Sequence, residues 1–153
     1  MINILFVCHG NICRSPMAEF VMKNLIQKAN INDIFIDSKA TSREEIGNPP
    51  HHQTIAKLKQ NNIPFTSHKS SQITLQDYDK FDYILCMDEA NIANSLRIFK
   101  SDPQNKIKLL LEFAGKKSNI ADPYYTGDFD KTYDDILLGC SALLEHLKRL
   151  LAK

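Results

Sequence analysis

The chain has 153 residues, of which 43% are hydrophobic and 24% charged, a composition typical of one globular domain. Its 19 Lys and Arg residues nearly balance its 18 Asp and Glu residues, and the formal charge of +1 argues against a broad nucleic-acid footprint or a polybasic membrane patch. No apolar run approaches the roughly 18 residues that cross a bilayer. We therefore expect one domain over residues 1–153, with neither nucleic acid nor membrane as a partner.

Apolar periodicity predicts strands and helices in alternation. Short apolar runs place the strands at residues 2–7, 34–36, 83–86 and 107–111. Apolar residues at helical spacing place the helices at about 15–25, 50–62, 89–99 and 129–151. Such alternation predicts a single-domain α/β fold, with a mostly parallel sheet, helices on both faces and right-handed crossovers.

The first and last helices carry the clearest local signals. Ser15 and Pro16 are typical of an N-cap and a first helical residue. In the last helix, apolar residues recur every three or four positions, which predicts one buried face. These residues are Phe129, Tyr133, Ile136, Cys140, Leu144, Leu147 and Leu151.

Two features of the sequence indicate the cytoplasm. Residues 2–7 are apolar, but they lack a basic lead-in and are not followed by a small-residue cleavage site, so we expect no signal peptide. The four cysteines are irregularly spaced, unlike the disulfide framework of a secreted domain, and we expect thiols. Cys86 and Cys140 lie within apolar patterns and are expected in the core.

The segment after the first strand predicts a phosphate-binding loop. Here a cysteine, five further residues and an Arg-Ser pair open a helix, so successive backbone N–H groups line a concave loop capped by a helix N-terminus. The carboxyl ends of parallel strands share one edge of the sheet, where such folds bind ligands. The pattern is not that of a nucleotide-binding P-loop, which argues against a nucleotide kinase.

Several residues of this loop suit phosphoryl transfer. Cys8, surrounded by N–H dipoles and a guanidinium, is expected to be a thiolate nucleophile. Arg14 is planar and permanently charged, so it can hold two phosphoryl oxygens. Ser15 can donate its hydroxyl to the sulfur. Gly10 and Asn11 tolerate the positive φ that such a loop requires.

Asp122 is the candidate general acid. It follows the fourth strand, so the topology brings it to the same edge of the sheet as Cys8. Pro123 biases Asp122 toward an extended backbone, and Tyr124 and Tyr125 offer aromatic walls for a flat leaving group. An Asp-Pro pair alone is common turn chemistry, and the phosphate loop is what favours the acid role.

Three motifs in order resemble the low-molecular-weight protein tyrosine phosphatases: the loop from Val7 to Pro16, the segment Phe81 to Asp88, and Asp122-Pro123-Tyr124-Tyr125. The resemblance covers almost the whole chain. It implies a four-stranded parallel sheet, hydrolysis of phosphotyrosine through a phosphocysteine intermediate, a phosphotyrosine-containing protein or peptide as partner, and no metal or organic cofactor. Weak self-association is left open.

The resemblance also implies roles for residues around the loop. Asn11, Ser38 and His68 match the positions of a hydrogen-bond network that holds the phosphate loop in shape. Cys13 matches a second loop cysteine that forms a reversible disulfide with Cys8 on oxidation.

Further positions are implied to contact the substrate. Ile12 suits the tyrosine-directed branch of the family, since a phosphoarginine-directed branch typically carries Thr there. Glu44 stands where many relatives place an aromatic wall, and an acidic rim disfavours acidic residues beside the phosphotyrosine. The expected substrate-binding residues are His9, Gly10, Asn11, Ile12, Cys13, Ser15, Glu44, Tyr124 and Tyr125.

Three alternatives compete with this interpretation. A thioredoxin-coupled arsenate reductase uses a similar loop but needs two further cysteines several residues apart, and none follows Cys86 between residues 87 and 95. A catalytically silent phosphate-binding module is disfavoured by the presence of nucleophile, clamp and acid. A zinc site at Cys8, His9 and Cys13 lacks an evident fourth ligand.

Overall fold

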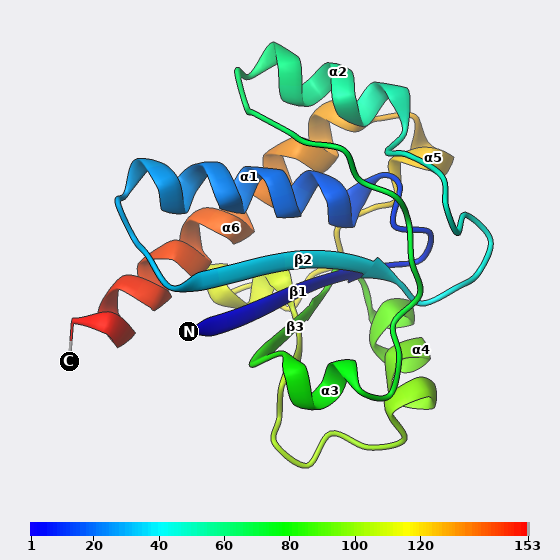
Figure 1. The fold of residues 1–153 in the computed structure, drawn as a ribbon. Coiled ribbons are helices and arrows are strands. Elements are labelled where there is room, and N and C mark those ends of the chain that lie inside the picture. The colour runs from blue at the N-terminus through cyan, green and yellow to red at the C-terminus, as the bar shows by residue number, and fades with distance from the viewer. Residues whose placement is uncertain (153) are drawn as a thin grey trace.

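Four parallel strands form the sheet at the centre of the computed structural model, which describes residues 1–152 (Figure 1). The strands are β1 (Ile2–Cys8), β2 (Ile34–Ala40), β3 (Tyr83–Cys86) and β4 (Ile107–Leu109). Their order in the sheet is β2-β1-β3-β4, and all neighbouring pairs are parallel. The parallel α/β sheet expected from the sequence is confirmed.

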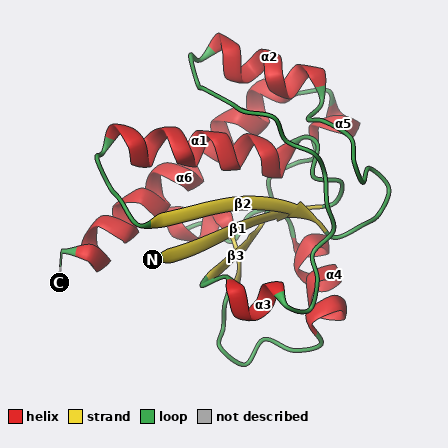
Figure 2. Ribbon diagram, viewed as in Figure 1, coloured by secondary structure: helices red, strands yellow, loops and turns green. Residues whose placement is uncertain are grey.

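Helices cover both faces of this sheet (Figures 1 and 2). Helices α1 (Arg14–Lys28) and α6 (Phe129–Leu151) pack together over one face, and α2 (His52–Gln60) packs against both. Helices α3 (Asp77–Lys80) and α4 (Glu89–Phe99) lie on the other face. A 3₁₀ helix, η1 (Leu110–Ala114), follows β4, and the short α5 (Pro123–Thr126) precedes α6.

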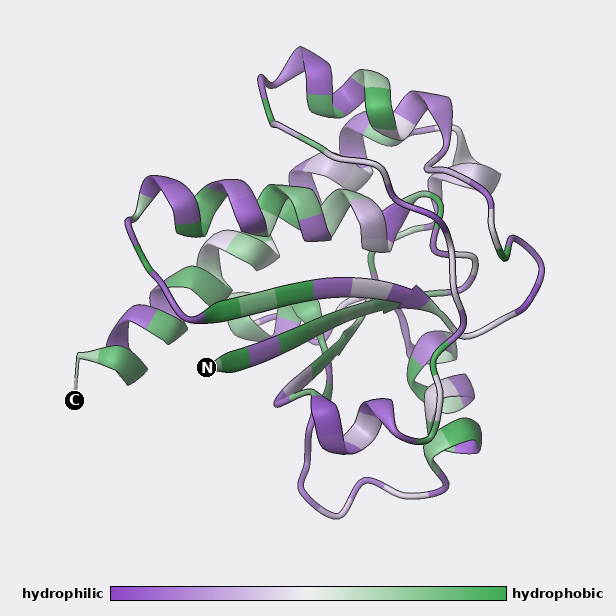
Figure 3. Ribbon diagram, in the orientation of Figure 1, coloured by the Kyte–Doolittle hydropathy of each residue, from purple (hydrophilic) through white to green (hydrophobic). Residues whose placement is uncertain are grey.

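Strand β1 explains why the molecule has a core on each side of the sheet. Successive side chains of a strand point to opposite faces, so Ile4 and Phe6 join the large core under α1 and α6, whereas Leu5 and Val7 join the smaller core near α4. All four side chains are fully buried, and Figure 3 shows apolar residues along the sheet. The same alternation turns Cys8, at the end of β1, toward the α1 side.

The expected elements agree with the structure most closely where periodicity is strong. The predicted bounds of β3, α4 and α6 match the observed ones, and Cys86 and Cys140 are fully buried as expected. Strand β2 extends to Ala40 rather than ending at residue 36, and β4 ends at Leu109 because the chain turns into η1. The sequence did not predict α3 or α5, which have only four residues each. Leu151 is 51% exposed, so the predicted buried face of α6 ends one turn earlier, at Leu147.

The start of α1 corrects the predicted N-cap. The helix begins at Arg14 with Cys13 as its N-cap, so Ser15 and Pro16 lie inside the first turn. Ser15 does not cap because its hydroxyl lies beside the Cys8 sulfur instead, at 3.0 Å. Pro16 is tolerated because N–H groups of the first helical turn have no partner within the helix.

None of the helices in residues 1–152 is both long enough and apolar enough to cross a membrane.

Gly139 lets α6 approach η1 closely. A Cβ atom at this position would lie 2.6 Å from Leu110 Cγ, and Leu110 is fully buried. We predict that Gly139→Ala lowers the free energy of unfolding by about 1–3 kcal/mol because of overpacking, although Ala favours a helix over Gly by about 1 kcal/mol. Urea-induced unfolding measures the change.

Ser141→Ala, a partly buried position in the same helix, is the matched control and should shift the free energy of unfolding by no more than about 0.5 kcal/mol. A Gly139→Ala variant more stable than the wild type would contradict the close packing of α6 on η1.

Candidate active site

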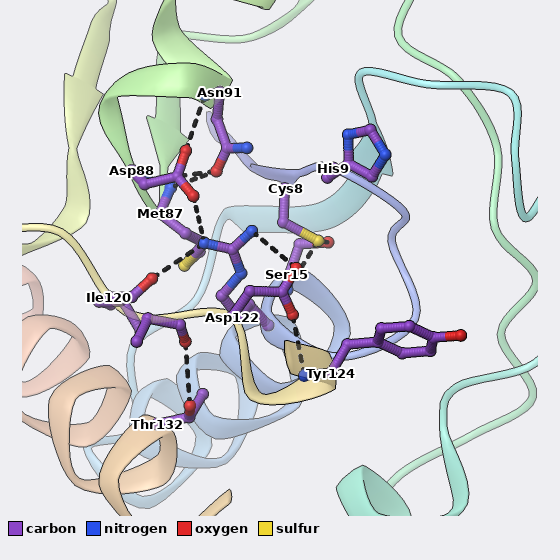
Figure 4. A network of polar contacts seen from close by, with 12 residues as sticks. Cys8, His9, Ser15, Met87, Asp88, Asn91, Ile120, Asp122, Tyr124 and Thr132 are labelled. Atoms are coloured by element: carbon purple, nitrogen blue, oxygen red, sulfur yellow. Dashed lines mark hydrogen bonds and ion pairs between the residues drawn. The ribbon is translucent and has the colours of Figure 1, made fainter. Parts of the chain in front are cut away.

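A cavity of about 180 Å³ opens at the carboxyl-terminal edge of the sheet, where the loop after β1 leads into α1. It brings together residues that are far apart in the sequence, and Figure 4 shows several of them. The lining residues are Cys8, His9, Gly10, Ile12, Cys13, Arg14, Glu44, Glu45, Asp122, Tyr124 and Tyr125. Asn11 and Ser15, which were expected to bind the substrate, do not line the cavity, and both residues are fully buried.

The sulfur of Cys8 lies at the base of the cavity among hydrogen-bond donors. The backbone N–H groups of Asn11 and Ser15 donate to Sγ at 3.2 and 3.4 Å, and Ser15 Oγ lies 3.0 Å away. The residue is 3% exposed, so water does not compete strongly for these contacts. Donors in this arrangement stabilise negative charge on sulfur.

The guanidinium of Arg14 is buried next to this sulfur, with only 2% of the residue exposed. Its Nη1 donates to Asp88 Oδ2 at 2.6 Å and to the carbonyl of Ile120 at 2.9 Å. Burial by itself lowers the pKa of Arg14, but the Cys8 sulfur and the Asp88 carboxylate outweigh this and raise the pKa above its ordinary value. The group therefore keeps its positive charge in the cavity.

Asp122 reaches the cavity from the start of α5. Its backbone is extended, as Pro123 predicts, and its Oδ1 caps α5 by accepting the Tyr124 N–H at 3.0 Å. Oδ2 is 3.4 Å from Arg14 Nη2. Thr132 of α6 donates its hydroxyl to the carbonyl of Ala121 at 3.1 Å, which holds this segment against the domain (Figure 4). One oxygen of the Asp122 carboxylate thus caps α5, and the other is the candidate proton donor.

A buried polar network supports the loop from behind. Asn11 has a φ of +56°, and its Nδ2 donates to Ser15 Oγ at 2.7 Å and to Ser38 Oγ at 3.0 Å. His68 Nε2 lies 2.9 Å from Asn11 Oδ1, and Ser38 donates to Glu19 at 2.6 Å. The structure therefore places Asn11, Ser38 and His68 together, and adds Glu19, which the sequence interpretation missed.

Gly10 does not have the positive φ expected for it. Only Asn11 among the loop residues adopts that conformation. A Cβ atom at Gly10 would lie 3.4 Å from Glu45 Cγ, so a larger residue would crowd the side of the cavity. Asn11 alone makes the left-handed turn because its amide is anchored by the network.

Glu19, Asp37 and His68 are the one group of described residues whose donor atoms converge as metal ligands would. Lys23 already pairs with Glu19 at 2.6 Å, and Ser38 holds the other Glu19 oxygen. The group is therefore better described as part of the loop-supporting network than as a metal centre.

Cys13 is the N-cap of α1 and is only 4% exposed. Burial, reinforced by Cys8 and Asp122, raises the pKa of its thiol to about 12, so it is protonated at neutral pH. Its carbonyl accepts the Thr54 hydroxyl at 3.3 Å, and both Cys8 and Cys13 are free thiols in this structure.

The rim of the cavity is polar and aromatic. His9 Nε2 lies 2.8 Å from Glu44 Oε2, and both side chains are substantially exposed. Tyr124 and Tyr125 are 59% and 78% exposed, so their rings stand at the mouth rather than in the core. Glu45 was not expected here; it adds a second carboxylate beside Glu44.

Asp88 is the most important residue that sequence reasoning missed. It follows β3 and caps α4: its Oδ1 accepts the Asn91 N–H at 2.8 Å, while Oδ2 receives Arg14. An acidic residue between a parallel strand and a helix, at the same edge as Cys8, was the available signal. The sequence places Asp88 in the segment from Phe81 to Asp88 but does not by itself reveal its contact with Arg14.

Comparison with known proteins decides the family. The model described as "Low molecular weight phosphotyrosine protein phosphatase" matches residues 3–153. The chain belongs to this family. Its phosphatase relatives include "Low molecular weight protein-tyrosine-phosphatase PtpA" of Staphylococcus aureus strain Newman, 38% identical over 96% of this chain and 94% of the relative.

Solved structures agree with this phosphatase assignment. The crystal structure of YfkJ from Bacillus subtilis has a TM-score of 0.93 and 39% identity over 97% of this chain and 96% of that one. The crystal structure of DARP, a Drosophila arginine phosphatase, has a TM-score of 0.86 and 36% identity over 97% and 98%. The predicted family and fold class are confirmed.

We predict that Asp88→Asn weakens this phosphatase without unfolding α4. Asn is as good an N-cap as Asp, but its amide nitrogen would face Arg14 Nη1, a donor against a donor. Loss of the acceptor leaves the buried guanidinium less well oriented, and kcat/KM for an aryl phosphate should fall by about tenfold to a hundredfold.

Asp128→Asn makes the same change at the N-cap of α6, where the carboxylate accepts the Lys131 N–H and is exposed. Its kcat/KM should stay within about twofold of the wild type. If the two variants behave alike, Asp88 does not position Arg14.

Proposed function

We propose that this phosphatase hydrolyses phosphotyrosine in proteins, with Cys8 as nucleophile, Arg14 as phosphate clamp and Asp122 as general acid and base. The observation that carries the proposal is the convergence of two backbone N–H donors and the Ser15 hydroxyl on one buried sulfur, next to a buried guanidinium. We also propose that residues 1–153 form a single phosphatase domain.

In the first step, the Cys8 thiolate attacks phosphorus and forms the S–P bond while the P–O bond to the tyrosine breaks. Asp122 gives its proton to the departing phenolic oxygen, so phenol leaves uncharged. In the second step, the Asp122 carboxylate takes a proton from water, whose oxygen attacks phosphorus. The S–P bond breaks, inorganic phosphate is released, and the returning thiolate is stabilised by the donors around it.

Arg14 is suited to follow the phosphoryl group through both steps. Its Nη1 is occupied by Asp88 and Ile120. Its Nε is buried and makes no hydrogen bond with any described residue. Nη2 makes only a long contact of 3.4 Å, to Asp122 Oδ2. The Nε and Nη2 edge is therefore suited to hold two equatorial phosphoryl oxygens once Nη2 exchanges this contact, and a fork of two parallel hydrogen bonds is the strong form of such binding.

The walls of the cavity favour a flat leaving group. Tyr124 and Tyr125 stand at its mouth, and Ile12 lines its side with an apolar surface. Because the similar protein DARP is an arginine phosphatase, phosphoarginine is the competing substrate. Ile12 offers no hydroxyl to a guanidinium. We therefore propose that phosphotyrosine peptides are hydrolysed faster than phosphoarginine peptides. Measuring kcat/KM for both kinds of peptide tests this proposal.

The proposal extends to surroundings and partners. Four free thiols suit a reducing compartment, and we assign the phosphatase to the cytoplasm with a phosphoprotein as its substrate. Association between copies of the chain is proposed to be weak at most, because the exposed apolar side chains are spread over several separate elements.

Arsenate reduction has less support than hydrolysis. A disulfide relay needs cysteines that can move between the interior and the surface. Cys86 and Cys140 are fully buried, and burial raises the pKa of the Cys86 thiol to about 12. Neither is suited to relay electrons to a partner protein.

We predict that Cys8→Ser abolishes turnover of p-nitrophenyl phosphate, by more than about 10⁴-fold. Binding of inorganic phosphate, measured as a rise in melting temperature, should persist because the loop N–H groups and Arg14 remain. Cys140→Ser makes the same substitution at a fully buried position of α6 and should retain turnover. A wild type that binds phosphate without turnover would support the silent module, and thioredoxin-dependent arsenite formation would support the reductase.

We predict that Asp122→Asn slows phenyl phosphate far more than p-nitrophenyl phosphate. Asn keeps an oxygen that can cap α5 but has no proton to give, and general acids contribute about 10²–10⁴-fold where the leaving group is poor. The ratio of the two kcat values, wild type against variant, is the measurement. Equal losses on both substrates would remove Asp122 from the acid role.

A further inference from the structure

A second cavity of about 330 Å³ lies beside the catalytic one. The two share a single lining residue, His9, which stands between them. The residues around the second cavity come from the loop after β1, from the loop after β2, from the segment before α3, and from α4. They are His9, Thr41, Ser42, Gln72, Asn94, Arg97 and Ile98.

The floor of this cavity is fixed to the catalytic loop by backbone hydrogen bonds. The Thr41 N–H donates to the carbonyl of Cys8 at 3.0 Å, and both the N–H and the hydroxyl of Ser42 donate to the carbonyl of His9. Gln72 donates its side-chain amide to the Thr41 carbonyl at 2.9 Å. The cavity therefore keeps a constant position relative to the nucleophile.

No acidic side chain lines the second cavity, whereas the cation Arg97 does. Arg97 contacts Asn94 Oδ1 at 2.8 Å and forms no ion pair within residues 1–152. Arg43 donates to Gln72 at 3.3 Å and likewise lacks an acidic partner among the residues described. Two cations thus lie in or next to a cavity that holds no carboxylate.

Thr41 adds an independent observation. The residue is 6% exposed, it lines this cavity, and its Oγ1 makes no hydrogen bond with any other described residue. A buried hydroxyl without a partner costs free energy. An acceptor that entered the cavity would supply the missing partner after a rotation of the Thr41 side chain.

The catalytic cavity has the opposite charge at its rim. Glu44 and Glu45 line that side, and Glu44 pairs with His9 at 2.8 Å. Glu44 and Glu45 thus line the cavity on one side of His9, and Arg97 lines the cavity on the other side.

We propose that the second cavity binds a carboxylate side chain of the substrate, from a Glu or Asp residue near the phosphotyrosine, with Arg97 as its main ionic contact. The proposal rests on the proposed function, because it concerns a substrate peptide of that same active site. The proposal modifies the expectation that an acidic rim disfavours acidic residues beside the phosphotyrosine. Repulsion of such residues would then apply only on the Glu44 side of His9.

The test uses the full chain and phosphotyrosine peptides in a neutral background. One Glu is placed at each flanking position in turn, with Gln at that position as reference, and kcat/KM is measured at low ionic strength. For at least one position the ratio of Glu to Gln should be about threefold to fivefold. The ratio should fall toward one at high salt, because exposed ion pairs are screened.

Arg97→Gln should bring this ratio close to one while leaving kcat/KM for p-nitrophenyl phosphate unchanged, since that substrate has no flanking residue. Arg149→Gln removes the same charge from an exposed site near the end of α6 and should keep the wild-type ratio.

Each unfavourable result has a distinct meaning. A ratio near one at every position in the wild type, or a ratio that survives in Arg97→Gln, overturns the assignment of the cavity while the aryl phosphate assay still supports the phosphatase. Absence of aryl phosphate turnover overturns the proposed function, and the cavity assignment with it.

Discussion

The buried positive charge of Arg14 is the constraint on which the rest of the site depends. An isolated charge taken out of water costs several kcal/mol, so a guanidinium that is 2% exposed must be paired on several sides. The nearby Cys8 sulfur, the Asp88 carboxylate and the Ile120 carbonyl supply this. These groups lie at the end of β1, after β3 and after η1, so segments far apart in the sequence have to come together before the charge is compensated.

A second requirement is the shape of the loop. Backbone N–H groups converge on one sulfur only if the chain turns sharply, and Asn11 takes the left-handed conformation that makes this turn. Such a conformation costs about 1–2 kcal/mol in a non-glycine residue. Asn11 offsets this through hydrogen bonds to Ser38 and His68, and Glu19 completes the network from inside α1. Function and stability are therefore coupled through buried polar contacts.

The sequence was sufficient to predict those features that follow from the spacing of apolar residues and from the order of the elements along the chain. Apolar spacing was sufficient for β3, α4 and α6, and strand order was sufficient to bring Asp122 near Cys8. The sequence-based predictions failed where one side chain has more than one possible partner. The Ser15 hydroxyl was expected at a helix cap but lies beside sulfur, and Asp88 is both a cap and a counter-charge, which spacing does not reveal. Periodicity in the sequence does not show which hydrogen-bond partner a side chain has in the folded protein.

The division between the two cavities bears on how such a small enzyme discriminates between substrates. In the proposed mechanism, the loop from Cys8 to Arg14 contacts the phosphoryl group. This group is the same in every phosphotyrosine, so the loop would contribute equally to all substrates and would not select among proteins. Selection must come from the rim, where His9 separates Glu44 from Arg97. Exposed charge contacts contribute only about 0.2–1 kcal/mol each, so no single rim residue excludes a substrate. Preference then arises from several weak contacts of opposite sign, which favours peptides whose charges are placed asymmetrically about the phosphotyrosine.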